Sequence, residues 1–334
     1  MKFGYSDTCL EHDTGGRHPE TPDRLRAIKR GLTRKHGVEY VEADPASVAA
    51  VEAIHDPEYV AAVEEFCASG GGNWDPDTVA VEETWDAALE SAGLAQWAAT
   101  AALDGNQGRE TPFSIGRPPG HHALSDDAMG FCFFNNAAVA AQTALDRVDR
   151  VAIVDWDVHH GNGTQEIFED RSDVLYASLH EDGLYPGTGD AEEIGTGEGE
   201  GTTCNVPLPA GTDDGGYLYA VEEVLAPTIE RFDPGLLLVS AGFDAHRHDP
   251  ISRMRVSTDG FGHLTIALRE IADDVEAPIA FVLEGGYGLD TLSEGVAMVH
   301  EVFDGHVPVE TESEPDEEVE GIVADLRERH GLGP

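Results

Sequence analysis

Six short segments of the chain are almost continuously apolar and rich in β-branched or aromatic residues. A strand that is covered on both faces needs apolar side chains at successive positions, and not only at alternate ones. The pattern therefore predicts buried strands of a mainly parallel sheet. They are Lys2–Tyr5, Pro112–Ile115, Val151–Trp156, Val174–Leu179, Gly235–Ala241 and Ile279–Leu283.

Segments with helical spacing of apolar positions lie between these strands. Thr21-Pro22-Asp23 predicts a capping hydroxyl and a proline at the start of the first helix, and Asp44-Pro45 and Asp56-Pro57 repeat this device. Longer helices are expected over Glu82–Leu103, Asn135–Leu145, Gly215–Arg231 and Ser257–Val275, and a short final helix over Ile322–His330.

Alternation of strands and helices predicts an α/β fold with a mainly parallel central sheet and helices on both faces. We expect one domain over residues 1–305, with its site at the carboxyl ends of the strands. Residues 306–334 are expected to form an acidic tail with a short helix. The glycine-rich and acidic segment 187–202 is expected to be a flexible, solvated loop.

The chain is strongly acidic, with 65 Asp and Glu against 20 Lys and Arg and a formal charge of -45. Such a charge keeps a protein soluble but makes the folded state repel itself, unless salt screens it. We therefore predict a salt-adapted cytoplasmic protein that does not bind nucleic acid, because no basic stripe is present. No apolar stretch predicts a membrane span or export signal, and four scattered cysteines predict reduced thiols.

Polar residues gather directly after four of the predicted strands. The segments are SIGRPPGHHALSDDAMGFCFFN, VDWDVHHGNG, LVSAGFDAHRHDP and FVLEGGYG. Ligands of open parallel sheets bind beyond the carboxyl ends of the strands. One such loop is easily explained by chance, whereas four together predict a functional site.

Asp157 and His159 are two residues apart, so on an extended segment their side chains point the same way. Asp244 offers a third ligand from another strand end. Two carboxylates and one imidazole suit a borderline divalent metal and leave coordination positions open, as a catalytic metal requires. Each aspartate taken alone is more often a simple turn cap, but the trio predicts a metal site.

His121 and His122 follow a Pro-Gly turn and can divide base and acid roles if a carboxylate, with Asp155 as the candidate, orients one of them. A pair of metal ligands or surface histidines is the alternative interpretation. Tyr287 follows two glycines, so its phenol can approach a carbonyl oxygen on which negative charge develops. A tyrosine beside glycines is otherwise most often a packing residue.

Together these segments resemble the zinc-dependent histone deacetylase family, in particular its class II branch. The superfamily includes acetoin-utilisation proteins and acetylpolyamine amidohydrolases. The blocks RPPGHHA, GFCFFN, VDWDVHHGNGTQ, SAGFDAH and LEGGYG match in order, and the similarity runs from about Tyr5 to His300. The resemblance implies an arginase/deacetylase-like fold and an amidohydrolase that removes the acetyl group of acetyl-lysine or a similar acetylated amine.

The resemblance also implies the metals. Zn²⁺, with Fe²⁺ as an alternative, would be held by Asp157, His159 and Asp244. A structural K⁺ would be held by Asp155, Ser178 and Leu179, with the main-chain carbonyls of Asp157 and His159.

Catalytic roles follow from the same resemblance. His122 would be the main general base and acid, and His121 its electrostatic neighbour oriented by Asp155. Tyr287 would polarise the acyl oxygen. Asn162 stands where class I members carry an aspartate beside the second histidine, and class II members commonly have Asn there. The match therefore predicts activity with a differently tuned His122.

Four further residues match substrate-binding positions of the family. Phe131 and Tyr185 correspond to aromatic walls of the acyl-lysine tunnel, and Gly130 to its mouth. Arg24 corresponds to a basic residue of the inner acetate-release pocket. His160 and His180 also lie in matching blocks, and we interpret both as structural.

Three alternatives compete with a lysine deacetylase. An acetylpolyamine amidohydrolase would use the same machinery, although Ile251 stands where polyamine-specific relatives often have glutamate. An arginase-like enzyme with two metals needs an additional aspartate where the chain has Gly161. A non-catalytic acyl-lysine binding protein is disfavoured because the metal and catalytic residues are all present. Oligomerisation is left open.

Overall fold

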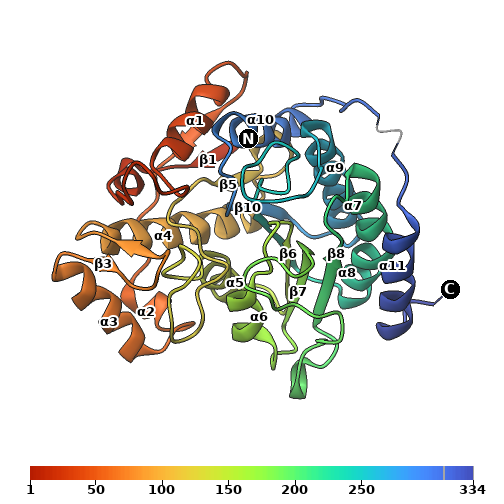
Figure 1. The fold of residues 1–334 in the computed structure, drawn as a ribbon, viewed down its shortest axis with the longest axis horizontal. Coiled ribbons are helices and arrows are strands. Elements are labelled where there is room, and N and C mark those ends of the chain that lie inside the picture. Colours follow the sequence, from red (N-terminus) through yellow and green to blue (C-terminus); the bar gives the residue numbers. More distant parts are fainter. Residues whose placement is uncertain (311–312, 334) are drawn as a thin grey trace.

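The computed structural model describes residues 1–310 and 313–333, in which an eight-stranded sheet forms the centre (Figure 1). Every neighbouring pair of its strands is parallel. The strands, in spatial order, are β2 (Glu39–Val41), β1 (Lys2–Gly4), β5 (Pro112–Ser114), β10 (Ile279–Leu283), β9 (Leu236–Ala241), β6 (Val151–Asp155), β7 (Val174–Glu181) and β8 (Thr203–Leu208). Strands β3 (Gly72–Asn73) and β4 (Val79–Ala80) form a separate antiparallel pair.

Helices cover both faces of the sheet, as the sequence predicts (Figure 1). One layer consists of α1 (Asp23–Leu32), α7 (Asp214–Ala220), α8 (Ala226–Phe232), α9 (Thr258–Asp274), α10 (Leu289–Phe303) and α11 (Glu317–Arg329). The other consists of α2 (Val48–Val51), α3 (Pro57–Ala68), α4 (Thr84–Leu103), α5 (Asn136–Ala144) and α6 (Asn162–Phe168). Across the described residues, none of the helices combines the length and apolar character needed to traverse a bilayer.

Strand β6 shows how the sheet separates two hydrophobic cores. Ala152 and Val154 belong to one core, while Val151 and Ile153 belong to the other. Successive side chains of a strand point to opposite faces, so both faces are apolar because both are covered.

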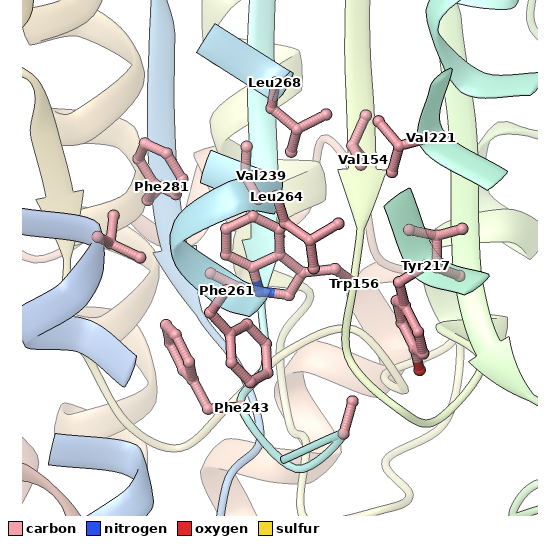
Figure 2. Close-up of a cluster of buried hydrophobic side chains, with 14 of the residues drawn as sticks. Val154, Trp156, Tyr217, Val221, Val239, Phe243, Phe261, Leu264, Leu268 and Phe281 are labelled. Atoms are coloured by element: carbon pink, nitrogen blue, oxygen red, sulfur yellow. The ribbon is translucent and has the colours of Figure 1, made fainter. Parts of the chain in front are cut away.

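Trp156 anchors the end of β6 (Figure 2). Its side chain is almost completely buried, and its ring lies about 6 Å from the rings of Phe243, Phe261 and Phe281. Because Trp156 stands between Asp155 and Asp157, its packing sets the direction in which both aspartates leave the strand.

The six predicted strands are confirmed with small shifts in their ends, but several elements were missed, among them β2, β8, α6, α10 and the β3–β4 pair. Strands β2 and β8 are the two edges of the sheet, and β2 is largely exposed, so its sequence lacks an apolar run. Helices α6 and α10 follow glycine-rich loops, whose turn signal conceals the helix start. In α10 the apolar positions nevertheless have helical spacing: Leu292, Val296, Val299 and Phe303.

Two details of the predicted helix starts are wrong. Pro22, and not Thr21, is the capping residue of α1, and the helix after Asp44-Pro45 starts only at α2, capped by Ser47. The Asp56-Pro57 prediction is confirmed, because the Asp56 carboxylate accepts the Glu58 N–H at the start of α3.

The predicted helix Gly215–Arg231 is interrupted by a π-helical turn over Val221–Leu225, between α7 and α8. Pro227 is the second residue of α8. A proline has no N–H to donate, so it cannot bond to the carbonyl four residues earlier, which is that of Glu223. Arg327 of α11 donates to that carbonyl at 2.9 Å. An interaction from the far end of the chain thus satisfies the backbone group that the proline leaves unpaired.

The segment 187–202 is not solvated throughout, contrary to expectation. Gly189 and Gly199 are buried, and a Cβ on Gly189 would lie 2.6 Å from the ring of His160. The four cysteines are free and buried, as predicted.

Helix α11 carries the acidic tail back onto the domain. Val319, Val323 and Leu326 belong to the same hydrophobic core as the sheet. Of the predicted tail, positions 311–312 and 334 lie outside the described residues.

We expect Val323→Ala to lower the free energy of unfolding by about 2 kcal/mol, because it deletes fully buried methyl groups. Val307→Ala is the matched control, since Val307 is 76% exposed and its truncation should change stability by less than about 0.5 kcal/mol. Urea unfolding of both variants measures the difference. Equal stability of the two would show that α11 does not pack on the domain in solution.

Candidate metal centre and active site

Four neighbouring strands at the centre of the sheet deliver the predicted site. Strands β5, β10, β9 and β6 are adjacent and parallel, so the loops after their carboxyl ends meet at one edge. His121 follows β5, Tyr287 follows β10, Asp244 follows β9, and Asp157 and His159 follow β6. The order of the strands in the sheet therefore explains why motifs far apart in the sequence meet at one site.

Asp157, His159 and Asp244 lie together and are all buried. One potential ligand atom from each lies within 4.8 Å of the others. The Nδ1 atom of His159 is 3.0 Å from Asp157 Oδ1 and 3.3 Å from Asp244 Oδ2. Two carboxylates and one imidazole are a donor set for a borderline divalent cation, with positions left for water and substrate.

In each of the two carboxylates, one oxygen accepts a hydrogen bond from a backbone N–H group. Asp157 Oδ2 accepts the Gly285 N–H at 2.7 Å, and Asp244 Oδ1 accepts the Val158 N–H at 2.9 Å. The other oxygen of Asp244, Oδ2, is buried and receives no hydrogen bond from the described residues, although His159 Nδ1 lies 3.3 Å away. A buried carboxylate oxygen without a donor is costly, and a metal ion would supply the missing partner.

Glycines allow the backbone to approach this centre. A Cβ on Gly285 would lie 2.2 Å from Asp244 Oδ2, and one on Gly242 would lie 2.1 Å from Asp157 Oδ2. Both distances are far below van der Waals contact. The glycines that follow β9 and β10 are therefore required by packing around the two carboxylates.

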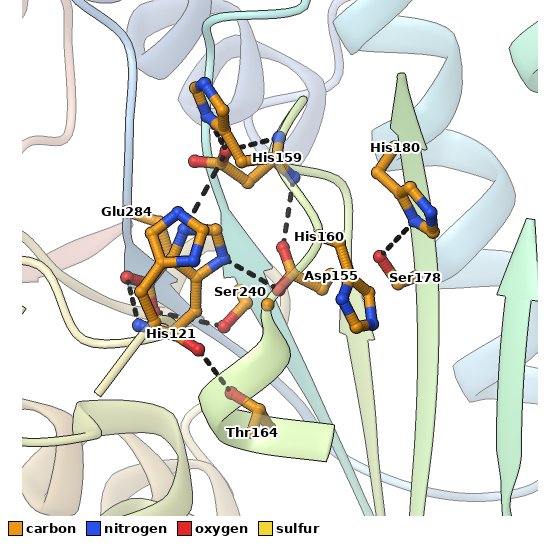
Figure 3. A network of polar contacts seen from close by, with 12 residues as sticks. His121, Asp155, His159, His160, Thr164, Ser178, His180, Ser240 and Glu284 are labelled. Carbon is orange, nitrogen blue, oxygen red and sulfur yellow. Dashed lines mark hydrogen bonds and ion pairs between the residues drawn. The ribbon is translucent and has the colours of Figure 1, made fainter. Parts of the chain in front are cut away.

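His121 and His122 have different partners. The centroids of their two rings are 4.0 Å apart. His121 Nδ1 lies 3.0 Å from Asp155 Oδ2 (Figure 3), whereas His122 Nδ1 lies 2.8 Å from the side-chain oxygen of Asn162. A carboxylate and an amide oxygen only accept hydrogen bonds, so both histidines carry a proton on Nδ1. The Nε2 atom of a neutral His122 is then a free base.

These partners set opposite pKa shifts. Burial lowers the pKa of His121, but the charges of Asp157 and Asp155 outweigh it and raise that pKa to about 10. Burial lowers the pKa of His122 well below its usual value, and the neighbouring charges of His121 and His159 lower it further. The pair therefore consists of a charged and a neutral imidazole, which fits a base beside an electrostatic neighbour.

Three aromatic side chains line the site: Tyr185 contacts His122, and Phe131 contacts Tyr287. The Tyr287 ring lies edge-on to Phe131 at 5.7 Å, and the Tyr185 ring lies edge-on to His122 at 5.1 Å. Tyr185 is 39% exposed, so it lies where the site opens. Within the described residues, the Tyr287 hydroxyl makes no hydrogen bond, and it is free to donate to a bound molecule.

Gly130 has a φ of 54°, and a Cβ there would lie 2.4 Å from the His122 ring. Glycine is thus required beside this histidine. Arg24 is fully buried, its guanidinium lies 5.0 Å from the centroid of the Tyr287 ring, and its Nε donates to the Gly286 carbonyl at 2.8 Å. The substrate-binding residues predicted from the resemblance thus all adjoin the site.

Asp155 and Ser178 are aligned on neighbouring strands β6 and β7, and both are fully buried. Leu179 follows Ser178 on β7. His180 bonds to Ser178 Oγ (Figure 3) and to the Gly189 carbonyl. His160 bonds to Thr188 and Gln165. Each of these two histidines has both ring nitrogens engaged, as a structural role requires.

Sequence reasoning assigned no role to Glu284, which is fully buried beside His121 (Figure 3). Its carboxylate accepts the N–H groups of Gly120 and His121 at 2.7 and 3.1 Å, and the Ser240 hydroxyl at 3.1 Å. Burial raises the pKa of Glu284 to about 7. An acidic residue directly after an apolar strand was the available signal, but its partners are more than 40 residues away.

Comparison with known proteins agrees with this geometry. The histone deacetylase domain family matches residues 18–303. A histone deacetylase-like amidohydrolase of Pseudomonas aeruginosa is 41% identical over 311 residues, covering 85% of this chain and 81% of the relative. A probable deacetylase of Archaeoglobus fulgidus is 38% identical over 293 residues, covering 86% and 81%. The crystal structure of the HDA15 HD domain superposes with a TM-score of 0.91 at 37% identity, covering 98% of this chain and 93% of that one.

We expect the protein to bind one divalent metal ion tightly. Asp244→Ala should weaken the affinity for this ion at least about 100-fold, because loss of a direct ligand costs at least as much affinity as loss of a residue that only supports a ligand. Elemental analysis after equilibrium dialysis against Zn²⁺ measures this. Asp316→Ala is the control, since Asp316 only caps α11. Unchanged metal content in Asp244→Ala would place the ion elsewhere.

Proposed function

This chain belongs to the histone deacetylase family, and we propose that it removes the acetyl group of N-acetyl-lysine or a similar acetylated amine in a zinc-dependent reaction. The observation that supports this most directly is the buried trio of Asp157, His159 and Asp244 beside the His121–His122 pair. A nearby phenol, that of Tyr287, completes the set of groups that amide hydrolysis requires.

Zn²⁺, with Fe²⁺ as the alternative ion, would be held by Asp157, His159 and Asp244, and when bound it supplies Lewis-acid polarisation of the acyl group and activation of water. The mixed oxygen and nitrogen donors and the unpartnered Asp244 Oδ2 fit such an ion. Binding requires an unprotonated imidazole at His159.

His122 acts as the general base. Its neutral ring accepts the proton of water as the water oxygen forms a bond to the amide carbon. Tyr287 donates a hydrogen bond to the acyl oxygen as negative charge develops there. The carbon–nitrogen bond then breaks, and the proton held by the histidine pair passes to the leaving nitrogen. The products are acetate and the free amine.

His121 supports this sequence without accepting the first proton. It is held by Asp155, and its positive charge adds to the effect of burial in lowering the His122 pKa. The Asn162 amide orients His122 without adding a charge, so His122 remains neutral before the reaction.

The substrate enters between aromatic walls. We assign Phe131 and Tyr185 to the sides of the acyl-lysine tunnel and Gly130 to its mouth. Arg24, buried against the Tyr287 ring, provides a positive charge on the inner side of the site, where it favours the acetate product.

A K⁺ ion would fit next to the metal strand. The proposed donors are the oxygens of Asp155, Ser178 and Leu179, with the carbonyls of Asp157 and His159. The support is the alignment of Asp155 with Ser178 on adjacent strands and the exclusively oxygen donor set, which suits a hard cation. Such an ion would compensate the fully buried Asp155 carboxylate.

We expect chelator-sensitive release of acetate from an acetyl-lysine peptide, assayed in molar KCl beside acetylated polyamines. Release from polyamines alone would change the substrate to a small amine and leave the chemistry intact. Absence of release from either, by a folded and metal-loaded protein, would contradict the proposed function.

We expect Tyr287→Phe to lower kcat by about 10²–10³-fold, because it removes one hydrogen-bond donor to the developing oxyanion. Tyr219→Phe on α7 removes the same hydroxyl away from the site and should leave kcat within about twofold of the unsubstituted protein. Steady-state acetate release measures both variants. A kcat for Tyr287→Phe equal to that of the control would exclude this role for Tyr287.

A further inference from the structure

Asp249 has a side chain that reaches the backbone of the Tyr287 loop. It stands five residues after Asp244 in the loop that follows β9, and only 7% of it is exposed. Its Oδ2 atom accepts the N–H groups of Tyr287 and Gly288 at 2.7 and 2.9 Å. One buried carboxylate thus holds the peptide groups on both sides of the Tyr287 α-carbon.

Apart from Asp249, the backbone beside Tyr287 is held by Arg24, whose Nε donates to the Gly286 carbonyl at 2.8 Å. Gly286 before it has a φ of 115°, a conformation that favours glycine, and Gly288 after it caps α10 without a side-chain hydrogen bond. Glycines on both sides leave the backbone with wide conformational freedom. The Tyr287 hydroxyl makes no hydrogen bond within the described residues, and its ring contacts are with Phe131 and Arg24.

Another anchor of the loop lies two residues before Tyr287. The Gly285 N–H donates to Asp157 Oδ2 at 2.7 Å, so this end of the loop is tied to the metal strand. Between the Gly285 and Tyr287 amides, the chain makes its left-handed turn. The position of the phenol relative to the trio therefore depends on the ties at the next two peptide groups, where Asp249 accepts both N–H groups and Arg24 donates to the Gly286 carbonyl.

Asp249 is itself held in place. Its Oδ1 atom accepts the Ile251 N–H at 3.1 Å, and its own N–H donates to the His246 carbonyl at 2.7 Å. The turn that carries it is thus rigid. A carboxylate fixed on both sides is able to impose a position on a glycine-rich loop, and not only to follow it.

We infer that Asp249 is the positioning residue that holds Tyr287 in register with the acyl oxygen. The inference rests on the proposed function of Tyr287 as a hydrogen-bond donor in amide hydrolysis. Asp249 acts through the Tyr287 backbone and does not touch the substrate. Removing it should therefore impair the chemical step and leave substrate affinity nearly unchanged.

We expect Asp249→Ala to lower kcat about 10- to 100-fold with KM within about twofold, since a misplacement of about 1 Å is enough for such a loss. In a Tyr287→Phe background the same substitution should cost less than about threefold, because the group that it positions is already absent. If the kcat loss of the double variant equals the product of the two single-variant losses, the inference is overturned. If Asp249→Ala does not fold, Asp249→Ser provides the same cycle, as its shorter side chain cannot reach both amides.

Two variants separate positioning from general stability. Asp249→Asn keeps an oxygen that accepts both N–H groups and should recover most of kcat. Asp214→Ala is the matched control, because buried Asp214 accepts the Ser257 N–H and hydroxyl at 2.6 and 2.7 Å at the start of α9. It should lower stability and leave kcat within about twofold. A kcat loss in Asp214→Ala as large as in Asp249→Ala would overturn the inference.

Hydrogen exchange of the peptide that contains residues 284–289 tests the same inference without catalysis. The Tyr287 and Gly288 amides should be protected in the unsubstituted protein and exchange at least about tenfold faster in Asp249→Ala. Equal protection in both proteins would overturn the positioning role. If the unsubstituted protein releases no acetate, the proposed function fails, but this measurement still decides whether Asp249 holds the loop.

Discussion

Burial of two carboxylates within a few ångströms of each other is the constraint around which the site is organised. Asp157 and Asp244 are fully buried, and such charges are unfavourable without compensating partners. The His159 imidazole lies between them, and backbone N–H groups of Val158 and Gly285 satisfy one oxygen of each. A divalent cation at the proposed site would complete the compensation, because it would neutralise the two buried carboxylates.

The two adjacent histidines differ in chemistry because their partners differ in charge. Asp155 stabilises a positive charge on His121, whereas the neutral Asn162 orients His122 and adds none. Burial lowers the pKa of His122, and the neighbouring charge of His121 lowers it further. The difference in pKa between two identical side chains therefore arises from their surroundings.

Carboxylates also hold the loops that carry these groups. Glu284 accepts two successive backbone N–H groups of the histidine loop, and Asp249 accepts two of the tyrosine loop. Gly285 lets the backbone of the tyrosine loop approach the two carboxylates, and Gly130 of the histidine loop leaves room for the His122 ring, but glycine also brings conformational freedom. The buried carboxylates restrict that freedom, so the reacting groups are held in place before substrate arrives.

The sequence by itself determined the class of fold and the residue types of the site, because continuous apolar runs report strands buried on both faces and Asp157, His159 and Asp244 suit a metal. It also placed these residues after strands whose carboxyl ends share an edge. Only the tertiary structure decided which strands are neighbours and that Arg327 donates to the Glu223 carbonyl. It also decided which backbone N–H groups donate to the carboxylates of Glu284 and Asp249. Those contacts join residues far apart in the chain, and local patterns of polarity carry no information about such partners.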